Sequence, residues 1–473
     1  MAKSISPVPL LRSSRLNVVI LLFSVNLILF SHRSKIFPIS IPDDLNAENV
    51  TLVEKNPVEL YFTNYFLYGY MSSALIAGIL SNKIGSKWLI GLSVFGSSSA
   101  FLATPFIEQL AENKLYLIGL RFILGICQGL ALPSILTMAA FWFPKKERTC
   151  LMGVVLFGVQ LGSIVLTETS SNDSTWLSQI PIVTYVFSAI GFAWFFVWSL
   201  FAHSTVEGDT LISKEEYYYI NDQIQFKPDD EVTKFIPWKH IFLSGSAWVL
   251  IFIHCLATFS NYIIIGLLPN LLKKLFTIPH SITQFIPFIA LFILFLFMLI
   301  FGFLADFFIA KKMMSTTNCR KIWVLLAFTG TASLLVAISF LKEDNGYLAF
   351  LFFVIGLGLS GLQYTSIITS YLDIASTFGG IVFGIGESIC CLILICTPFL
   401  IKLLAPNDTR KEWNRVFWIV SGTLCFGALV FTLLFDGHIK SWAYTSTKKM
   451  KTKKKENTEK KLSLITEEET ENI

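Results

Sequence analysis

The sequence contains few charged residues. Asp, Glu, Lys and Arg together make up 15% of its 473 residues, whereas 54% of the residues are hydrophobic. Soluble domains average about 25% charged residues, so this composition argues against an ordinary soluble protein. The small net charge of +5 comes largely from basic loops and the C-terminal tail. That distribution suggests contact with an anionic lipid leaflet rather than with nucleic acid.

Catalytic and metal-binding patterns are also missing from the sequence. The loops contain no nucleophile–base cluster, phosphate loop or metal-type spacing, and the eight cysteines form no CxxC pair. We therefore expect neither an enzyme nor a bound metal or other cofactor. The cysteines lie in or beside apolar runs, as is typical of small buried hydrophobic side chains. No cleavable signal peptide is evident after the first apolar run.

The sequence does have long apolar runs of about 20 residues, the length that a helix needs to cross a membrane. Such runs are too long for barrel strands, so we expect an all-α membrane protein. The first span is read as one long helix that includes polar positions, although a shorter helix ending at Phe30 remains open. Twelve transmembrane helices are predicted, at 16–40, 60–81, 87–107, 115–142, 150–168, 179–202, 243–268, 281–305, 321–341, 346–370, 375–404 and 413–436.

The spans fall into two groups of six. Gly78–Asn82 ends the second span and Gly302–Asp306 ends the eighth, and basic residues follow both segments. Such a parallel repeat predicts two pseudo-symmetric six-helix bundles. A short surface helix is expected around Ser213–Gln225, between the two groups. The predicted parts are a cytosolic N-terminus (1–15), an N-terminal bundle (16–202), a cytosolic linker (203–242), a C-terminal bundle (243–436) and a disordered cytosolic tail (437–473).

Two signals predict the orientation in the membrane. Lysine and arginine gather at the N-terminus, at 83–87, 145–148 and 311–321, and in the tail, all on one side of a twelve-span chain. The positive-inside rule makes that side cytosolic. The three glycosylation sequons begin at Asn49, Asn172 and Asn407 and fall on the opposite side. Both termini are therefore expected in the cytosol.

The fourth span carries a polar face inside an apolar helix. Arg121, Gly125, Gln128 and Leu132 share one side of the helix by their spacing. An arginine in a membrane helix costs roughly 2.5–3.5 kcal/mol, so it normally faces a bundle interior or a wet cavity. Its planar fork suits a carboxylate or phosphate, although snorkelling or a structural ion pair are alternatives. Gln128 could bind a ligand or could join neighbouring helices.

Other polar residues lie deep in the predicted spans. Glu387 begins about thirteen residues into the eleventh span, close to the midplane by helical rise. A carboxyl group at that depth could bind and release protons, or could pair with an internal arginine or hydroxyl. His254 could relay protons or could be a hydrogen-bonded core histidine. Tyr70 and Tyr262 could offer hydroxyls to a ligand or could serve in packing.

Several short motifs in a fixed order resemble the anion–cation symporter family of the major facilitator superfamily, the group of sialin, the vesicular glutamate transporters and the type I sodium–phosphate cotransporters. The resemblance implies transport of an organic anion or inorganic phosphate by alternating access, coupled to protons, sodium or membrane potential. It matches Arg121 and Arg33 to the family's anion-handling arginines and Tyr70 and Tyr262 to its cavity tyrosines. The motifs are Arg121–Gly125 with Gly129, Pro133, Trp142, Pro144, Glu147 and Arg148; Pro237–Lys239; Ser315–Lys321; and Asp373–Ala375 with Gly379, Gly380 and Gly384.

The departures from the family pattern are informative. Gln128 stands where proton-coupled members have a glutamate, and Glu387 stands where the family usually has an asparagine. We therefore predict that Glu387 replaces the missing coupling group and that His254 assists it. Thr63 and Ala257 replace the histidine and arginine of the vesicular glutamate transporters, so glutamate is not the expected substrate.

The superfamily also uses a latch between helices on the cytosolic side. The residues that match it are Gly78, Asn82, Lys83, Gly302 and Asp306. Asn82 lacks the charge of the usual acid, so the first half of the latch should be the weaker one. A transporter-like receptor or scaffold that binds a ligand without moving it remains the alternative function.

The expected partners follow from this interpretation. They are a small anionic substrate and the lipid bilayer, with no nucleic acid, and the chain is expected to be monomeric. A co-transported proton or sodium ion takes the place of a cofactor. The membrane is either the plasma membrane or a lysosomal or vesicular membrane.

Overall fold

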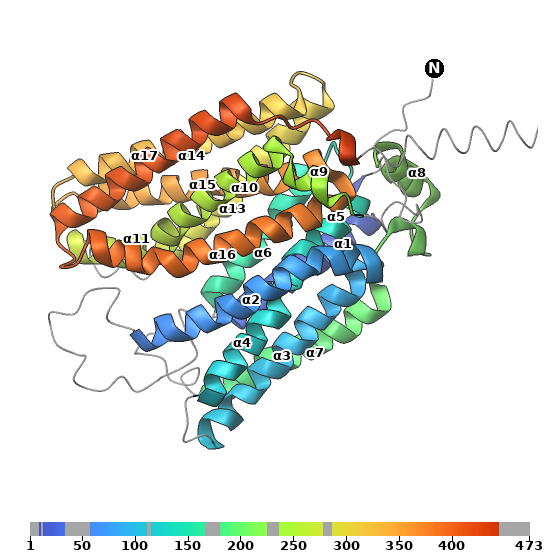
Figure 1. Cartoon of the computed structure of the whole chain (residues 1–473), viewed down its shortest axis with the longest axis horizontal. Coiled ribbons are helices and arrows are strands. Elements are labelled where there is room, and N and C mark those ends of the chain that lie inside the picture. The colour runs from blue at the N-terminus through green and yellow to red at the C-terminus, as the bar shows by residue number, and fades with distance from the viewer. Residues whose placement is uncertain are drawn as a thin grey trace, which may run out of the picture.

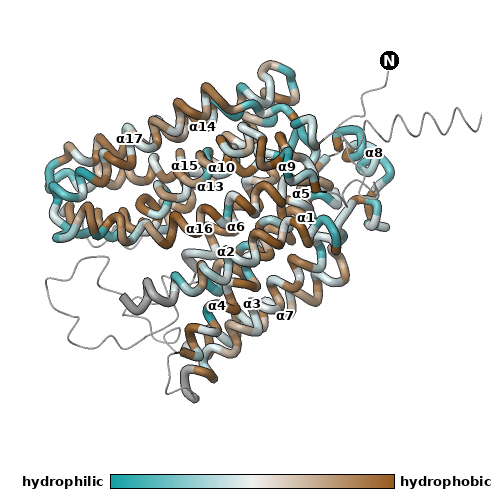
Figure 2. Tube along the Cα trace, in the orientation of Figure 1, coloured by the Kyte–Doolittle hydropathy of each residue, from teal (hydrophilic) through white to brown (hydrophobic). Residues whose placement is uncertain are grey.

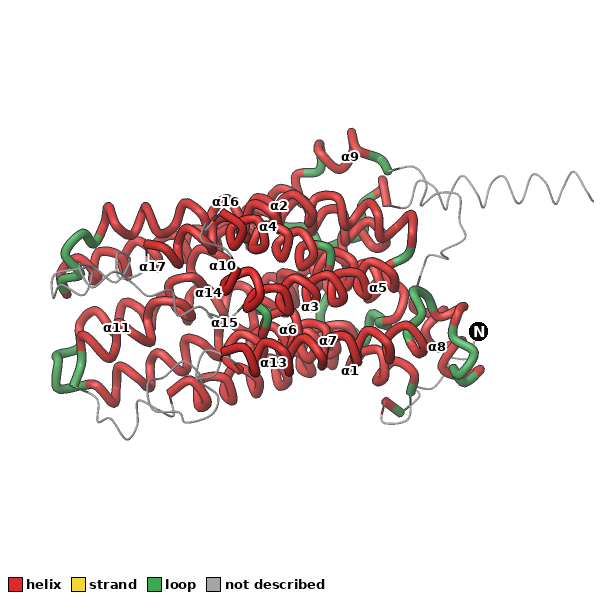
Figure 3. The backbone as a smooth tube through the Cα atoms, turned by 90° about the horizontal axis from the view of Figure 1, so that it is seen from below, coloured by secondary structure: helices red, strands yellow, loops and turns green. Residues whose placement is uncertain are grey.

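The computed structural model describes residues 9–10, 13–33, 57–110, 115–165, 180–224, 236–277 and 286–443. These residues form helices and their connections, and no strand occurs among them (Figure 3). The N-terminal half contains α1 (Ser14–Ser31), α2 (Pro57–Ile84), α3 (Ser86–Leu110), α4 (Leu115–Gly129), α5 (Ala131–Trp142), α6 (Arg148–Val165) and α7 (Ile180–Phe201).

The C-terminal half follows a helical linker. The linker carries η4 (Val206–Gly208), α8 (Lys214–Gln223) and α9 (Trp238–Phe242). The surface helix predicted between the two halves is therefore present as α8. The C-terminal helices are α10 (Gly245–Asn261), the π-helical turn η6 (Tyr262–Leu267), α11 (Leu268–Leu275), α13 (Ile286–Ala310), α14 (Thr316–Phe340), α15 (Gly346–Ala375), η7 (Ser376–Phe378), α16 (Gly379–Leu404) and α17 (Arg410–Leu434).

The helices have the length and composition of membrane spans. Within the described ranges, nine segments are long and apolar enough to cross a membrane, and one of them, Gly346–Leu404, contains both α15 and α16. A tenth segment, Arg148–Ser163, is a shorter apolar helix. The remaining predicted span corresponds to α2, whose tyrosines, serines and asparagines make it more polar. Figure 2 shows apolar residues along the helices and hydrophilic ones at their ends and around α8.

The first span is shorter than the sequence predicted. The helix α1 ends at Ser31, and the backbone N–H of His32 bonds to the carbonyls of Ile28 and Phe30. Arg33 lies just beyond the helix, and the rest of the predicted span lies outside the described residues. The alternative of a short helix is therefore the correct one, because the apolar run stops where His32 and Arg33 begin.

The fourth span extends over Leu115–Trp142, as predicted, but it consists of two helical segments, α4 and α5. Pro133 has no N–H for the carbonyl of Gly129, and its ring crowds that carbonyl. The break between α4 and α5 falls at Leu130, directly after Gly129. Leu130 keeps right-handed helical dihedral angles, so only the hydrogen bonding of the helix is disturbed there.

The two halves form two bundles, and the main contacts between them join α2 and α5 with α16 and η7, and α6 with α13 and α15. The bundles lie close together near α8 and α9, here called the linker end, and diverge toward the other end (Figure 1). Asn407 precedes α17 at that other end, here called the sequon end. Asn407 is exposed, whereas Asn49 and Asn172 lie outside the described residues.

Glycines allow the bundles to approach closely toward the linker end. A Cβ atom on Gly78 would lie 2.4 Å from the carbonyl oxygen of Gly380. One on Gly384 would lie 2.5 Å from the carbonyl oxygen of Ala74. Real Cβ atoms do not tolerate such distances, so the contact between α2 and α16 needs glycine at Gly78 of α2 and at Gly384 of α16. Close helix packing is thus the role of the glycines in this part of the sequence.

Candidate functional site

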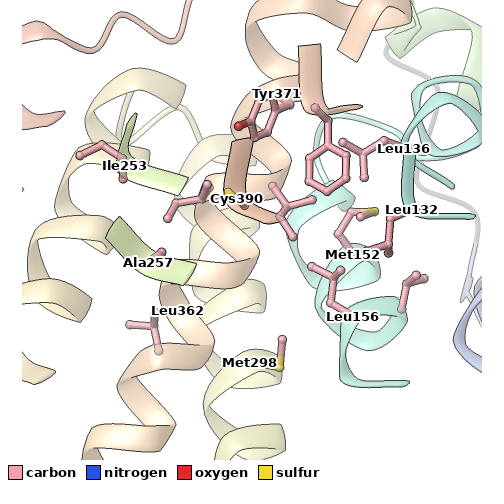
Figure 4. Packing of buried hydrophobic residues seen from close by; sticks show 14 of the residues in the cluster. Leu132, Leu136, Met152, Leu156, Ile253, Ala257, Met298, Leu362, Tyr371 and Cys390 are labelled. Carbon is pink, nitrogen blue, oxygen red and sulfur yellow. The ribbon is translucent and has the colours of Figure 1, made fainter. Parts of the chain in front are cut away.

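A cavity of about 280 Å³ lies between the two bundles. Residues of α5, α6 and the end of α1 line it from the N-terminal bundle, and residues of α10, η6, α15 and α16 line it from the C-terminal bundle. The polar lining residues are Arg33, Gln160, Ser163, His254, Thr258, Asn261, Tyr262, Tyr364 and Glu387. Figure 4 shows Leu132 and Leu156 of the N-terminal bundle facing the side chains of the other bundle across this interface.

Arg33 is held by one hydrogen bond and three aromatic rings. Its Nε donates to Oε1 of Gln128 over 2.7 Å. The guanidinium carbon lies 3.9 Å from the ring centre of Phe30, 4.9 Å from that of Phe66 and 4.7 Å from that of Tyr70. Cation–π contacts of this kind stabilise a desolvated arginine. They fix the guanidinium at the cavity wall while its charge stays available to an anion.

Gln128 is a support for Arg33 rather than part of the cavity wall. It is 1% exposed, and its amide nitrogen donates to the carbonyl of Leu29 and to Oγ of Ser97, each over 2.9 Å. Its oxygen accepts the bond from Arg33. The three bonds join α4 to α1 and α3, which corresponds to the interhelical role that the sequence left open.

We expect Gln128→Ala to raise KM for the anionic ligand about tenfold without preventing folding. Arg33 would lose its hydrogen bond to Oε1 of Gln128, which holds the guanidinium in its present orientation. Hydrogen bonds to charged groups contribute about 1.5–3 kcal/mol. The measurement is the concentration dependence of uptake, with thermal unfolding measured in parallel. Gln223→Ala, which removes an amide on the linker helix α8 away from the cavity, serves as the matched control. An unchanged KM for Gln128→Ala would contradict this positioning role.

Glu387 connects the two bundles at the cavity. Its side chain is 18% exposed, and Tyr70 of α2 donates its hydroxyl hydrogen to Oε1 over 3.2 Å. Nε2 of His254 lies 3.6 Å from Oε2, and Nδ1 of the same ring lies 3.2 Å from the hydroxyl of Tyr371. The carboxyl group therefore stands within a chain of groups that can accept or pass on a proton.

Only some of the predicted site residues line the cavity. Arg33, Tyr262, His254 and Glu387 line the cavity, and Tyr70 contacts Glu387 from behind the wall. Arg121 is not among the lining residues, because α4 packs closely on α2 along this face. A Cβ atom on Gly125 would lie 2.1 Å from the carbonyl oxygen of Phe66. The arginine at the cavity is therefore Arg33.

Five polar lining residues were not singled out from the sequence. Ser163 and Thr258 carry small hydroxyl groups, and the other three are Gln160, Asn261 and Tyr364. Oδ1 of Asn261 accepts a hydrogen bond from Nε2 of Gln363 over 2.7 Å, so the amide is held in place. Gln160, Asn261 and Tyr364 are polar residues within apolar spans, and this position in the sequence could have identified them as candidates. Among the described residues, no group of three or more His, Cys, Asp or Glu side chains could hold a metal ion.

At the linker end, Asp306 of α13 caps the first turn of α6 in the other bundle. Its two carboxylate oxygens accept from the backbone N–H groups of Thr149 and Cys150 over 3.1 and 2.8 Å. A carboxylate at a helix N-terminus is stabilised by the unpaired N–H groups and the helix dipole. A Cβ atom on Gly302 would lie 3.1 Å from Cα of Cys150, so this contact depends on a close backbone approach.

The corresponding contact of the first half is different. Nδ2 of Asn82 donates over 3.4 Å to the carbonyl of Gly78 in its own helix. Its Oδ1 is buried and has no hydrogen-bond partner within the described residues. Lys83 is exposed. At this position the bundles meet through the backbone contact between Gly78 and Gly380 instead of through a charged cap.

A second ionic contact joins the bundles beside Asp306. Asp373 of α15 accepts from Nε of Arg320 over 2.8 Å and from Nη1 of Arg148 over 3.3 Å. Nη1 of Arg320 also donates to Oγ1 of Thr149 over 2.9 Å. Arg148 and Thr149 begin α6, whereas Arg320 and Asp373 belong to the other bundle, so these bonds hold the linker end together.

Asp373→Ala is expected to lower the unfolding temperature by several degrees and the uptake rate at least about tenfold. Removing one partner of a buried ion pair costs about 3–5 kcal/mol, because the remaining charges are left buried and unpaired. Asp436→Ala is the matched control, since Asp436 is half-exposed and pairs locally with Lys440. Wild-type stability and uptake in Asp373→Ala would show that this contact does not control the linker end.

The linker helix α8 is attached to the N-terminal bundle. Oε1 of Glu216 accepts from the backbone N–H and from Nε of Arg15, and Arg15 also pairs with Glu147. Tyr219 donates to Glu147 over 2.9 Å, and burial raises the pKa of this phenol above its usual value. The Glu216 carboxylate thereby caps the first turn of α1. The contacts thus attach α8 to the first bundle.

Two bundles of membrane helices around a polar cavity define a class, the secondary transporters of the alternating-access type. Residues 21–394 match the family model described as the Major Facilitator Superfamily. The proton:xylose symporter XylE has the same fold, with a TM-score of 0.62 and 16% identity over 88% of this chain and 94% of XylE.

Similar proteins indicate which group of secondary transporters the chain belongs to. An uncharacterized transporter, slc-17.2, of Caenorhabditis elegans is 30% identical over 80% of this chain and 77% of its own length. Sialin of Homo sapiens is also 30% identical, over 80% of this chain and 75% of its own length. Vesicular glutamate transporter 3 of Danio rerio is 25% identical over 80% of this chain and 64% of its own length. The chain belongs to the major facilitator superfamily and, within it, to the anion–cation symporter group of these relatives.

The comparisons also bear on the type of function. The relatives are transporters rather than enzymes, and none supports the alternative of a receptor or scaffold that does not move its ligand. The predicted family, fold and transport function are confirmed at this level.

Proposed function

We propose that the protein is a proton-coupled transporter of a small organic monoanion, which binds at Arg33 and is driven through Glu387 and His254. The observation that carries the proposal is that Arg33 and Glu387 line the same cavity from different bundles. A ligand between them would contact both halves, as alternating access requires. The names of the relatives, among them sialin and the vesicular glutamate transporters, support an anionic cargo.

The charges in the cavity favour one negative charge on the ligand. Arg33 is the one arginine or lysine among the lining residues of this cavity, and Glu387 is the one carboxylate. Because Glu387 is neutral once it is protonated, Arg33 alone balances the charge of the ligand. A second negative charge would stay unpaired in the cavity, at a cost of several kcal/mol. The volume of about 280 Å³ also limits the cargo to a small molecule.

The same charges suggest how coupling works. A proton on Glu387 removes its charge, so the anion at Arg33 is no longer opposed and the loaded cavity is neutral. After the anion and the proton leave, the deprotonated carboxylate of Glu387 can balance the positive charge of Arg33 while the empty carrier returns. Tyr70 supports this exchange, because it touches Glu387 through its hydroxyl and Arg33 through its ring.

The proposed orientation puts the linker end in the cytosol. Lysines and arginines at 83–87, 145–148 and 311–321 support this assignment, as does the sequon at Asn407 at the opposite end. In this state the bundles are joined at the linker end by Asp306 and Asp373. The cavity would then load from the non-cytosolic side.

A panel of labelled anions tests the proposed substrate class. In proteoliposomes with an imposed pH gradient, monocarboxylates small enough for the cavity should be taken up with saturation, at least about tenfold faster than dicarboxylates of similar size. That ratio corresponds to about 1.4 kcal/mol of discrimination, well within the cost of an unpaired second charge in the cavity. Equal uptake of both classes would contradict the monoanion, and binding without uptake would contradict transport.

A further inference from the structure

Two cysteines touch each other beside the cavity. Sγ of Cys255 on α10 lies 3.8 Å from Sγ of Cys390 on α16. All eight cysteines lie in described parts of the chain and are free, and this is the one thiol–thiol contact among them. Figure 4 shows Cys390 next to the turns of α10 that carry Ile253 and Ala257.

The pair lies between two open spaces. Cys390 lines the central cavity. Cys255 lines a separate apolar groove of about 480 Å³ between α10 and α16, bordered by Trp248, Phe252 and Ile393. The side chains are only 9% and 2% exposed, but each borders a space large enough for a small neutral oxidant.

We propose that Cys255 and Cys390 form a reversible disulfide that ties α10 to α16 and reduces transport. A disulfide needs a sulfur–sulfur distance of about 2.05 Å, so the two sulfur atoms must approach by about 1.8 Å from their present contact. Such a movement lies within the reach of side-chain rotation and a small shift of two adjacent helices.

The oxidant is a hydroperoxide, with hydrogen peroxide as the simplest case. One thiol loses its proton, and its sulfur attacks a peroxide oxygen. The O–O bond breaks, and the released hydroxide takes up that proton, which gives a sulfenic acid and one water molecule. The second thiol loses its proton and attacks the sulfenic sulfur, and the hydroxide that leaves takes up this proton to give the second water. Two thiols and one peroxide thus give one disulfide and two waters, with two electrons passing from sulfur to oxygen. A dithiol reverses the reaction by exchange.

The consequence for transport follows from the neighbours of the pair. Cys255 follows His254 directly, and Glu387 lies one helical turn before Cys390. A bond that draws α10 and α16 together would change the 3.6 Å separation between His254 and Glu387. This effect on transport rests on the proposed function, whereas formation of the disulfide does not.

The test uses the full chain in proteoliposomes, treated with hydrogen peroxide and then with an alkylating reagent. Non-reducing peptide mapping should identify a peptide that joins Cys255 to Cys390. Uptake should fall at least threefold and recover with dithiothreitol. Cys255→Ser and Cys390→Ser, each compared with its own untreated rate, should lose this sensitivity, whereas Cys425→Ser, which removes an exposed thiol on α17, should keep it.

The outcomes separate the disulfide from the transport mechanism. Absence of the joined peptide, or pairing through Cys391 instead, would overturn the proposal. A joined peptide with unchanged uptake would overturn the regulatory effect. If no anion is transported under any condition, the proposed function fails, and the peptide map still decides whether the disulfide forms.

Discussion

Arg33→Ala is expected to lower kcat/KM for the anionic substrate by at least about 30-fold. The side chain is the one arginine among the lining residues of the cavity, and it is half-buried against the rings of Phe30, Phe66 and Tyr70. Loss of one partner of a hydrogen-bonded charge pair costs about 2–5 kcal/mol, and each 1.4 kcal/mol is tenfold. Initial rates of labelled uptake in proteoliposomes measure the effect.

Two variants make this result specific. Arg33→Lys keeps the charge but loses the planar fork and the bond to Gln128, so we expect intermediate uptake. Arg410→Ala removes an arginine that also lies over an aromatic ring, that of Phe276, but does so at the sequon end away from the cavity. It should retain near wild-type uptake. Equal loss in Arg410→Ala and Arg33→Ala would exclude a particular role for Arg33.

Glu387→Gln is expected to remove the response of transport to a pH gradient. In the wild-type protein, with one proton moved per anion and the membrane potential clamped, a gradient of one pH unit should support about tenfold accumulation, because one unit corresponds to 1.36 kcal/mol. The glutamine cannot carry the proton, so the variant should equilibrate the anion without accumulating it. Exchange of labelled for unlabelled substrate should continue, since the amide oxygen of the introduced glutamine would still accept the hydrogen bond from the Tyr70 hydroxyl.

The control for this variant is Glu343→Gln. Glu343 is a carboxylate in the connection between α14 and α15, its side chain is 73% exposed, and it pairs with Arg410 far from the cavity. Accumulation should remain about tenfold per pH unit. If Glu387→Gln still accumulates substrate to the wild-type level, the coupling group is another residue.

Much of the fold could be predicted because the membrane restricts the choices. Apolar runs of helix-spanning length admit few structures in lipid, and the repeat of Gly78–Asn82 and Gly302–Asp306 indicates two bundles. The length of α1 and the break after α4 were harder to predict. Both depend on local backbone events, at His32 and at Pro133, that a search for apolar runs does not detect.

The site could be predicted only in part, for a different reason. Periodicity places Arg121 and Gln128 on one face of a helix, but it does not identify the helix that covers this face. In the structure α2 packs there through Gly125, and Gln128 turns to Arg33. Depth in the span was the better signal, because His254 and Glu387 both line the cavity. Gln160, Asn261 and Tyr364 also line the cavity and also lie within apolar spans, but they are uncharged and therefore less conspicuous in the sequence.

The most direct test of the account measures the anion and the proton together. Proteoliposomes that enclose a pH-sensitive dye are given labelled monocarboxylate at a clamped membrane potential, and both signals are recorded from the same sample. The account predicts acidification of the interior in step with uptake, at one proton for each anion, and loss of both signals in Arg33→Ala. Uptake of the anion without any proton movement would contradict it.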